Sequence, residues 1–213
     1  MSFNNADGKA VLLKIVAAIK ENKDYLSEID GLIADGDHGM NMNKGFSMFG
    51  ERIEDEEITF AEGLDELGTL LLTEIGGSMG PIYGTLLMEM GDVIEDLEVI
   101  DTAEFASMLA SGYDELCDIV EARVGDKTLM DTLTPAKEVM QKAAKDGKSL
   151  AEALTEMKEA AVAGRDSTKD LMARYGRSSR LGERSIGVLD AGAVSCCVIL
   201  TAMADGIIEQ IGG

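Results

Sequence analysis

Apolar residues recur at helical spacing along almost the whole chain, and this pattern limits the fold more than any other feature. Leu64, Leu67, Leu71 and Ile75 form one such stripe. Residues three or four positions apart share one face of an α-helix, so each stripe predicts a helix with one buried side. The stripes predict eight or nine helices, over residues 8–22, 40–54, 60–75, 81–97, 102–122, 131–146, 150–164, 166–175 and 191–210.

Local signals at the helix ends agree with this prediction. Thr59 with Glu62, and Ser149 with Glu152, match the capping box, in which two side chains satisfy free amide groups at a helix start. Pro81 suits a first helical turn, where its missing N–H has no partner to lose. No Ser/Pro-rich linker or internal repeat divides the 213 residues. The sequence therefore predicts an all-α protein with a single domain over residues 1–213.

The charge of the chain restricts its partners. It has 40 acidic and 19 basic side chains, a formal net charge of −21. Such a surface repels nucleic acid and anionic lipid, so we expect neither nucleic acid nor a membrane as a partner. No signal peptide is visible, and the longest apolar run, 193–204, is too short to span a bilayer. We expect a soluble, cytoplasmic protein whose cysteines stay reduced.

Three aspartates within eight residues give the strongest chemical signal. Asp30, Asp35 and Asp37 are interleaved with glycines that allow sharp turns. Short carboxylates are the oxygen ligands that Mg²⁺ prefers, and Mg²⁺ usually keeps positions for water and phosphate. The spacing does not fit an EF-hand, because Gly39 stands at the fifth position counted from Asp35. The pattern indicates a metal–phosphate site, while a solvated turn with capping aspartates stays open.

Two glycine-containing segments supply further candidate phosphate donors. Residues 40–46 look like the first turns of a helix after the aspartates, and a helix N-terminus favours phosphate. Residues 76–81, Gly-Gly-Ser-Met-Gly-Pro, join two apolar stretches with a loop whose amides can cradle phosphate oxygens. This loop also matches the nucleophile elbow of serine hydrolases. That interpretation is rejected, because a helix precedes the loop and the single His of the chain, His38, precedes the serine.

Most of the basic side chains in the polar loops gather near the C-terminal end. Arg177, Arg180 and Arg184 stand in one loop of a chain that is otherwise poor in positive charge. Arginine can hold a phosphate through two parallel hydrogen bonds, although ion pairing with the acidic surface is the alternative. Alternate loops of antiparallel helices fall at the same end of a bundle. We therefore expect the aspartate, glycine–serine and arginine loops to meet at one end.

Together these motifs resemble the DhaL family, the nucleotide-binding subunits of dihydroxyacetone kinases that are driven by the phosphotransferase system. The resemblance covers essentially the whole chain in the same motif order. It rests on Asp30 and on residues 35–46, 76–81, 126–128, 182–187 and 190–192. The combination is highly specific, whereas each motif alone is weak.

The resemblance implies a barrel of about eight antiparallel helices, with a nucleotide held by loops at one end. It implies two Mg²⁺ ions held by Asp30, Asp35 and Asp37. The family's contacts to ADP or ATP match His38, Gly39, Met40, Asn41, Ser78, Met79, Leu129, Arg177, Asp190, Ala191 and Gly192. Of these, Arg177 is the candidate for a catalytic role.

The same resemblance implies a function shared with two partners. Bound ADP acts as a coenzyme that a DhaM-like phosphoprotein recharges to ATP. The phosphoryl group then passes to dihydroxyacetone, which a DhaK-like subunit holds covalently. The absence of an obvious general base or nucleophile in this chain fits a substrate that is carried by a partner. The sequence does not decide whether the chain forms a homodimer.

Three departures from the family pattern bear on the site and on the function. A family glycine contact upstream of residues 126–128 falls on Val120 and is not carried over. Met79 stands where serine is common, and Ala191 stands where proline is frequent. Met79 in particular invites the alternative of an ATP-dependent kinase for a short ketose such as erythrulose. A non-catalytic, nucleotide-sensing module is the third possibility, because the chain lacks a self-contained active site.

Overall fold

The computed structural model describes residues 2–212, which fold into eight α-helices, with the longest connection, residues 168–190, between the last two. The helices are α1 (Gly8–Ile33), α2 (His38–Arg52), α3 (Phe60–Glu74), α4 (Met79–Ile94), α5 (Thr102–Ile119), α6 (Met130–Lys145), α7 (Leu150–Ser167) and α8 (Ala191–Gly212). Short 3-10 helices cover Asn5–Asp7, Thr168–Asp170 and Ser178–Ser185. The two-residue strands β1 (Phe3–Asn4) and β2 (Val99–Ile100) pair antiparallel, with Phe3 opposite Ile100.

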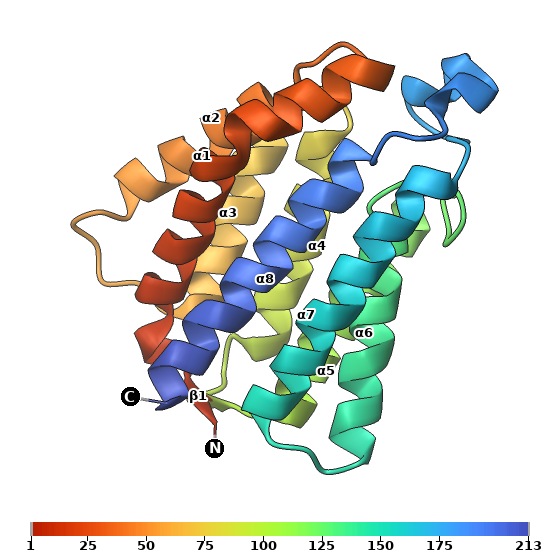
Figure 1. Ribbon diagram of the computed structural model, residues 1–213. Helices are drawn as coiled ribbons and strands as arrows, with labels where there is room; N and C mark the ends of the chain where they lie inside the picture. Colours follow the sequence, from red (N-terminus) through yellow and green to blue (C-terminus); the bar gives the residue numbers. More distant parts are fainter. Residues whose placement is uncertain (1, 213) are drawn as a thin grey trace.

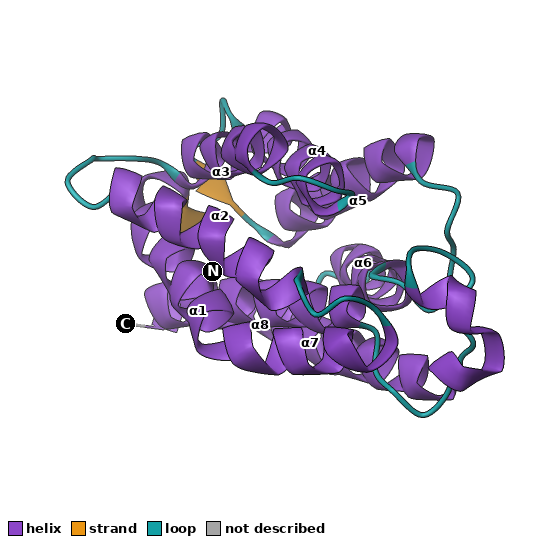
Figure 2. Cartoon of the chain, turned by 90° about the horizontal axis from the view of Figure 1, so that it is seen from above, coloured by secondary structure: helices purple, strands orange, loops and turns teal. Residues whose placement is uncertain are grey.

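The eight helices form a closed barrel. Each helix packs against the next one in the chain, and α8 returns to pack against α1 (Figure 2). Because successive helices run in opposite directions, the connections that follow α1, α3, α5 and α7 lie at one end, at the top of Figure 1. The start of α1 and the end of α8 lie at the other end. The predicted all-α fold and its arrangement of loops are confirmed.

Apolar side chains from all eight helices fill the barrel and hold the loops in place. Phe46, Phe49, Phe60 and Phe105 are among the largest side chains that are completely buried. Burying an aromatic or aliphatic side chain of this size stabilises the fold by roughly 1.5–3 kcal/mol. Among the described residues, α8 is the one helix long and apolar enough to span a membrane, and 72% of its most apolar window is buried inside the protein. This burial is what a central core helix requires.

The helix starts follow the local signals in the sequence. The capping boxes at Thr59 and Ser149 are both formed, and a third stands at Asp101, whose side chain accepts from the amides of Ala103 and Glu104. Pro81 lies in the first turn of α4, as expected. These caps fix where α3, α5 and α7 begin, at the end of the barrel opposite the polar loops.

Two of the expected helix boundaries are wrong. The helix expected over 8–22 continues to Ile33, because Leu26, Ile29 and Ile33 extend its buried face. Asp30 and Gly31 therefore lie in the last turn of α1 and not in a loop.

The helix expected over 166–175 does not form. α7 ends at Ser167, a 3-10 turn covers Thr168–Asp170, and the following backbone is irregular up to the 3-10 helix at Ser178. Backbone groups of this segment bond to a distant loop and not within a helix: the carbonyl oxygen of Thr168 accepts from the Lys127 side chain, and the N–H of Arg174 donates to the carbonyl oxygen of Asp126.

Candidate functional site

A cavity of about 850 Å³ opens at the loop end of the barrel. The chain segments that follow α1, α3, α5 and α7 all contribute to its wall. The first residues of α2, α4 and α8 and the residue preceding α6 also line it. Four helix N-termini therefore reach one cavity, and each offers backbone N–H groups that lack a partner within the helix. Such an arrangement can bind an anionic ligand despite the acidic surface.

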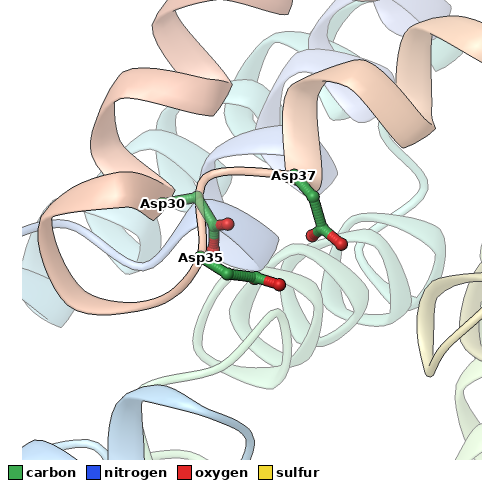
Figure 3. A group of neighbouring side chains, drawn as sticks. All are labelled: Asp30, Asp35 and Asp37. Atoms are coloured by element: carbon green, nitrogen blue, oxygen red, sulfur yellow. The ribbon is translucent and has the colours of Figure 1, made fainter.

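The three aspartates meet at one side of this cavity, as the sequence predicts. Asp30 comes from the last turn of α1, whereas Asp35 and Asp37 come from the connection to α2. One carboxylate oxygen of each residue lies within 4.8 Å of the others, and the side chains project into a shared space (Figure 3). The carboxylates of Asp35 and Asp37 are about half exposed. The group can hold a divalent metal ion and leave room for water or phosphate at the same ion.

Arg177 approaches the aspartates from the opposite side of the cavity. It immediately precedes the 3-10 helix Ser178–Ser185, and its guanidinium forms an ion pair with Asp35. The same guanidinium nitrogen lies 3.7 Å from an oxygen of Asp37. Because 142 residues of chain separate Arg177 from Asp35, the fold alone creates this contact. The cavity thus places a guanidinium and three carboxylates around one volume, where a metal ion and a phosphate can share them.

The N-terminal turn of α2 is held by a buried polar network. His38 Nε2 lies 2.8 Å from Ser195 Oγ, and the backbone N–H of His38 makes a long, 3.4 Å contact with Asp30. Burial lowers the pKa of His38 to about 4, so the imidazole is neutral at physiological pH. Gly39 packs against α1, where a Cβ would collide with the carbonyl oxygen of Lys23. Of the expected contacts at this turn, His38 and Asn41 line the cavity, whereas Gly39 and the exposed Met40 do not.

We predict that His38 titrates far below an ordinary histidine in the metal-free protein. Its folded-state pKa lies below its ordinary value of 6.5, so the unfolded chain binds the proton first as the pH falls. The neutral imidazole therefore contributes stability above pH 6.5 that is lost as the pH falls from 6.5 to about 4. Because the chain has one His, NMR follows this titration without assignment. A midpoint near 6.5 would contradict the burial.

Two further helix starts bring the remaining predicted residues to the cavity. At α4, Ser78 and Met79 both line the wall, and the Ser78 side chain makes no capping hydrogen bond. At α8, Asp190, Ala191 and Gly192 line it, and Asp190 Oδ2 accepts from the backbone N–H of Ala193 at 2.8 Å. Burial raises the pKa of Asp190 to about 7, against the opposing effects of the Ala193 N–H and of Lys127.

Lys127 is a site residue whose role sequence reasoning missed. It stands in a polar loop, yet its side chain is fully buried and its backbone adopts a left-handed conformation, with φ of 61°. Its ammonium donates to the carbonyl oxygens of Thr168 and Val188, at 2.6 and 2.5 Å. Burial lowers the pKa of Lys127, while the carboxylates of Asp190 and Asp131 act in the opposite direction. The sequence signal that could have identified Lys127 is the motif at residues 126–128, which carries part of the family resemblance but has no assigned role.

Apolar side chains make up much of the cavity wall. Ile82, Ile119, Val120, Ala122 and Leu129 contribute to this wall. A ligand that has an apolar part and a phosphorylated part fits a cavity with both apolar and charged lining. The apolar part is removed from water, while the charged part can contact the Arg177 guanidinium and the backbone N–H groups. The sequence predicted Leu129 as a contact, whereas the contribution from the end of α5 was missed.

Comparison with known proteins shows the family to which the chain belongs. The model of the DAK2 domain matches residues 32–205. A Listeria innocua protein described as "PEP-dependent dihydroxyacetone kinase 2, ADP-binding subunit DhaL" is 33% identical over 205 residues, which is 94% of each chain. The corresponding ADP-binding subunit DhaL of Escherichia coli is 35% identical over 184 residues, covering 85% of this chain and 87% of the relative.

Solved structures support the fold independently. The dihydroxyacetone kinase of C. freundii, crystallised with AMP-PNP and Mg²⁺, superposes with a TM-score of 0.70 at 20% identity. The match covers 96% of this chain and 34% of that protein, so the chain spans about a third of its length. At this identity the likeness concerns the fold alone. The match of the domain model and the identity to two DhaL subunits over most of the chain show that this protein belongs to the DAK2 domain family, in its DhaL branch.

Proposed function

We propose that this chain is the ADP/ATP-carrying subunit of a dihydroxyacetone kinase, and that a phosphoprotein of the phosphotransferase system recharges its nucleotide. The observation that carries the proposal is the cavity that joins three carboxylates and a guanidinium to an apolar wall at the loop end. The reaction is taken from the DhaL relatives, which are described as ADP-binding subunits of dihydroxyacetone kinases. We take the whole chain, residues 1–213, as one domain of this type.

The donor chemistry of the site fits a nucleotide with Mg²⁺. Asp30, Asp35 and Asp37 offer only oxygen ligands, clustered closely enough to share ions, and we propose that they hold two Mg²⁺. When bound, Mg²⁺ would neutralise phosphate charge that the acidic protein otherwise repels. The nucleotide contacts that we propose are His38, Gly39, Met40, Asn41, Ser78, Met79, Leu129, Arg177, Asp190, Ala191 and Gly192. Gly39 and Met40 would take part through the backbone at the start of α2.

The residues of this chain position the phosphates, and we assign the role of nucleophile to none of them. Backbone N–H groups at the starts of α2, α4 and α8 point donors at the polar part of the cavity. Arg177 leaves its ion pair with Asp35 and donates to phosphate oxygens, where it balances charge that develops during transfer. Phosphoryl transfer requires mainly such positioning, so the acceptor hydroxyl can be carried by another subunit.

The proposed partners follow from a site that positions the phosphates while another subunit carries the acceptor. We propose a DhaK-like subunit that presents dihydroxyacetone at the mouth of the cavity, and a DhaM-like phosphoprotein that charges ADP at the same opening. Both proteins would act in the cytoplasm. A homodimer of this chain is compatible with the proposal but is not required by it, because the described residues of one chain surround the cavity.

A reconstituted reaction tests the proposal. Charged DhaM, this protein with ADP, DhaK and dihydroxyacetone are mixed, and the phosphorylated ketose is measured by mass spectrometry. We expect product with catalytic amounts of ADP, and about one ADP per chain released when the purified protein is denatured. Turnover sustained by free ATP without DhaM would instead support the ATP-dependent ketose kinase suggested by Met79. No product with either donor would favour the nucleotide-sensing module.

A further inference from the structure

A network of buried polar side chains lies beside the cavity and connects three of the helices that line it. Ser195, on the first turns of α8, is completely buried, and its Oγ lies 2.8 Å from His38 Nε2 and 2.6 Å from the hydroxyl of Tyr83 on α4. Both hydroxyls also reach the carbonyl oxygen of Gly192, at 3.2 Å from Ser195 and 3.1 Å from Tyr83. One small network therefore connects the N-terminal parts of α2, α4 and α8.

The number of protons available for these hydrogen bonds favours one tautomer of His38. Four contacts need donors, namely His38 to Ser195, Ser195 to Tyr83, and each hydroxyl to Gly192. With a proton on Nε2, three protons are available, and three of the four contacts become hydrogen bonds. With the proton on Nδ1, only the two hydroxyl protons remain, and at most two contacts are satisfied. Because an unsatisfied buried polar contact is costly, the Nε2–H form is favoured.

We propose that Ser195 and Tyr83 are positioning residues that hold His38 as the Nε2–H tautomer, so that Nδ1 is presented to the cavity as an acceptor. His38 lines the cavity, and of its two imidazole nitrogens only Nε2 has a hydrogen-bond partner among the described residues. An unprotonated nitrogen repels phosphate oxygens and pairs with a donor, such as a hydroxyl or amino group of the nucleotide. The ligand in this proposal, a nucleotide, rests on the proposed function. The tautomer of His38 rests on the hydrogen bonds alone.

NMR of the imidazole tests the network without any ligand. Spectra at pH 8 show one histidine, in the neutral form, and the nitrogen shifts report which nitrogen carries the proton. We expect a single Nε2–H tautomer in the unmodified protein. Ser195→Ala, which keeps the helix, should produce a mixture of tautomers because Nε2 loses its partner. Tyr83→Phe should keep the Nε2–H form, because the remaining contacts still favour it.

Nucleotide affinity, measured with Mg²⁺, tests what the network is for. Ser195→Ala should weaken ADP binding about fivefold to tenfold, the effect of one buried hydrogen bond that no longer orients a binding group. Thr102→Val is the matched control, because Thr102 donates a part-buried hydroxyl to the Lys148 carbonyl at the far end of the barrel. It should change neither the tautomer nor the affinity. In the unmodified protein, ADP should move the Nδ1 resonance upfield, as acceptance of a hydrogen bond does.

The outcomes separate this proposal from the proposed function. An Nδ1–H form in the unmodified protein, or an unchanged tautomer in Ser195→Ala, would overturn the network. A shifted tautomer in Ser195→Ala with unchanged ADP affinity would overturn the positioning role of Ser195. Failure of the unmodified protein to bind any nucleotide would refute the proposed function, and would remove the ligand from this proposal while the tautomer measurement still stands.

Discussion

Replacing Asp35 or Asp37 with Asn should remove Mg²⁺-dependent nucleotide binding while leaving the barrel folded. The amide keeps the size of the side chain but loses the negative charge that a hard cation requires. Substituting even an outer partner of a metal ligand typically costs about 10- to 100-fold in metal affinity, so loss of a ligand should cost at least about a hundredfold. Isothermal titration calorimetry with ADP, with and without Mg²⁺, measures this effect.

The fold should tolerate these changes because Asp35 and Asp37 are half exposed and pair only with Arg177 among the described residues. An exposed ion pair contributes about 0–1 kcal/mol, so the free energy of unfolding should change by no more than that. Asp146→Asn is the matched control, because it breaks the exposed pair with Lys142 at the opposite end of the barrel. Unchanged ADP affinity in both site variants would refute the metal assignment.

The sequence predicted what depends on neighbours in the chain. Helical faces repeat every three or four residues, the Thr59 cap involves a residue three positions away, and the aspartates lie within eight residues of one another. These features need no knowledge of tertiary structure, and the structure reproduces them. The loops were also expected at one end, since that follows from antiparallel helices alone.

Contacts between distant segments could not be predicted in this way. Ser195 is a single hydroxyl in an apolar helix, and such a residue is ordinary until the fold brings His38 beside it, 157 positions away in the chain. The helix expected over 166–175 fails for the same reason, because its backbone is tied to Lys127. Lys127 itself follows Gly125 and Asp126, which is typical of a solvated loop, although its side chain is buried.

Lys127→Met should be the most destabilising of the substitutions considered, and it should also weaken nucleotide binding. The ammonium donates to two backbone carbonyls, of Thr168 and Val188, in two segments that border the cavity. An unsatisfied buried acceptor costs about 1–3 kcal/mol, and the removed cost of burying a charge offsets part of that loss. We therefore expect the free energy of unfolding to fall by about 2–4 kcal/mol, measured by urea denaturation.

The effect on binding should arise from geometry, because Val188 lies two positions before Asp190, the residue that precedes α8. Without the Lys127 ammonium, this segment loses its tie to the loop that precedes α6, and Asp190 loses a nearby positive charge. Lys142→Met is the control, since it removes an exposed lysine that pairs only with Asp146 among the described residues, and it should leave the free energy of unfolding nearly unchanged. If Lys127→Met were as stable as Lys142→Met, water would be able to satisfy both carbonyls, and the buried ammonium would not be what holds these loops together.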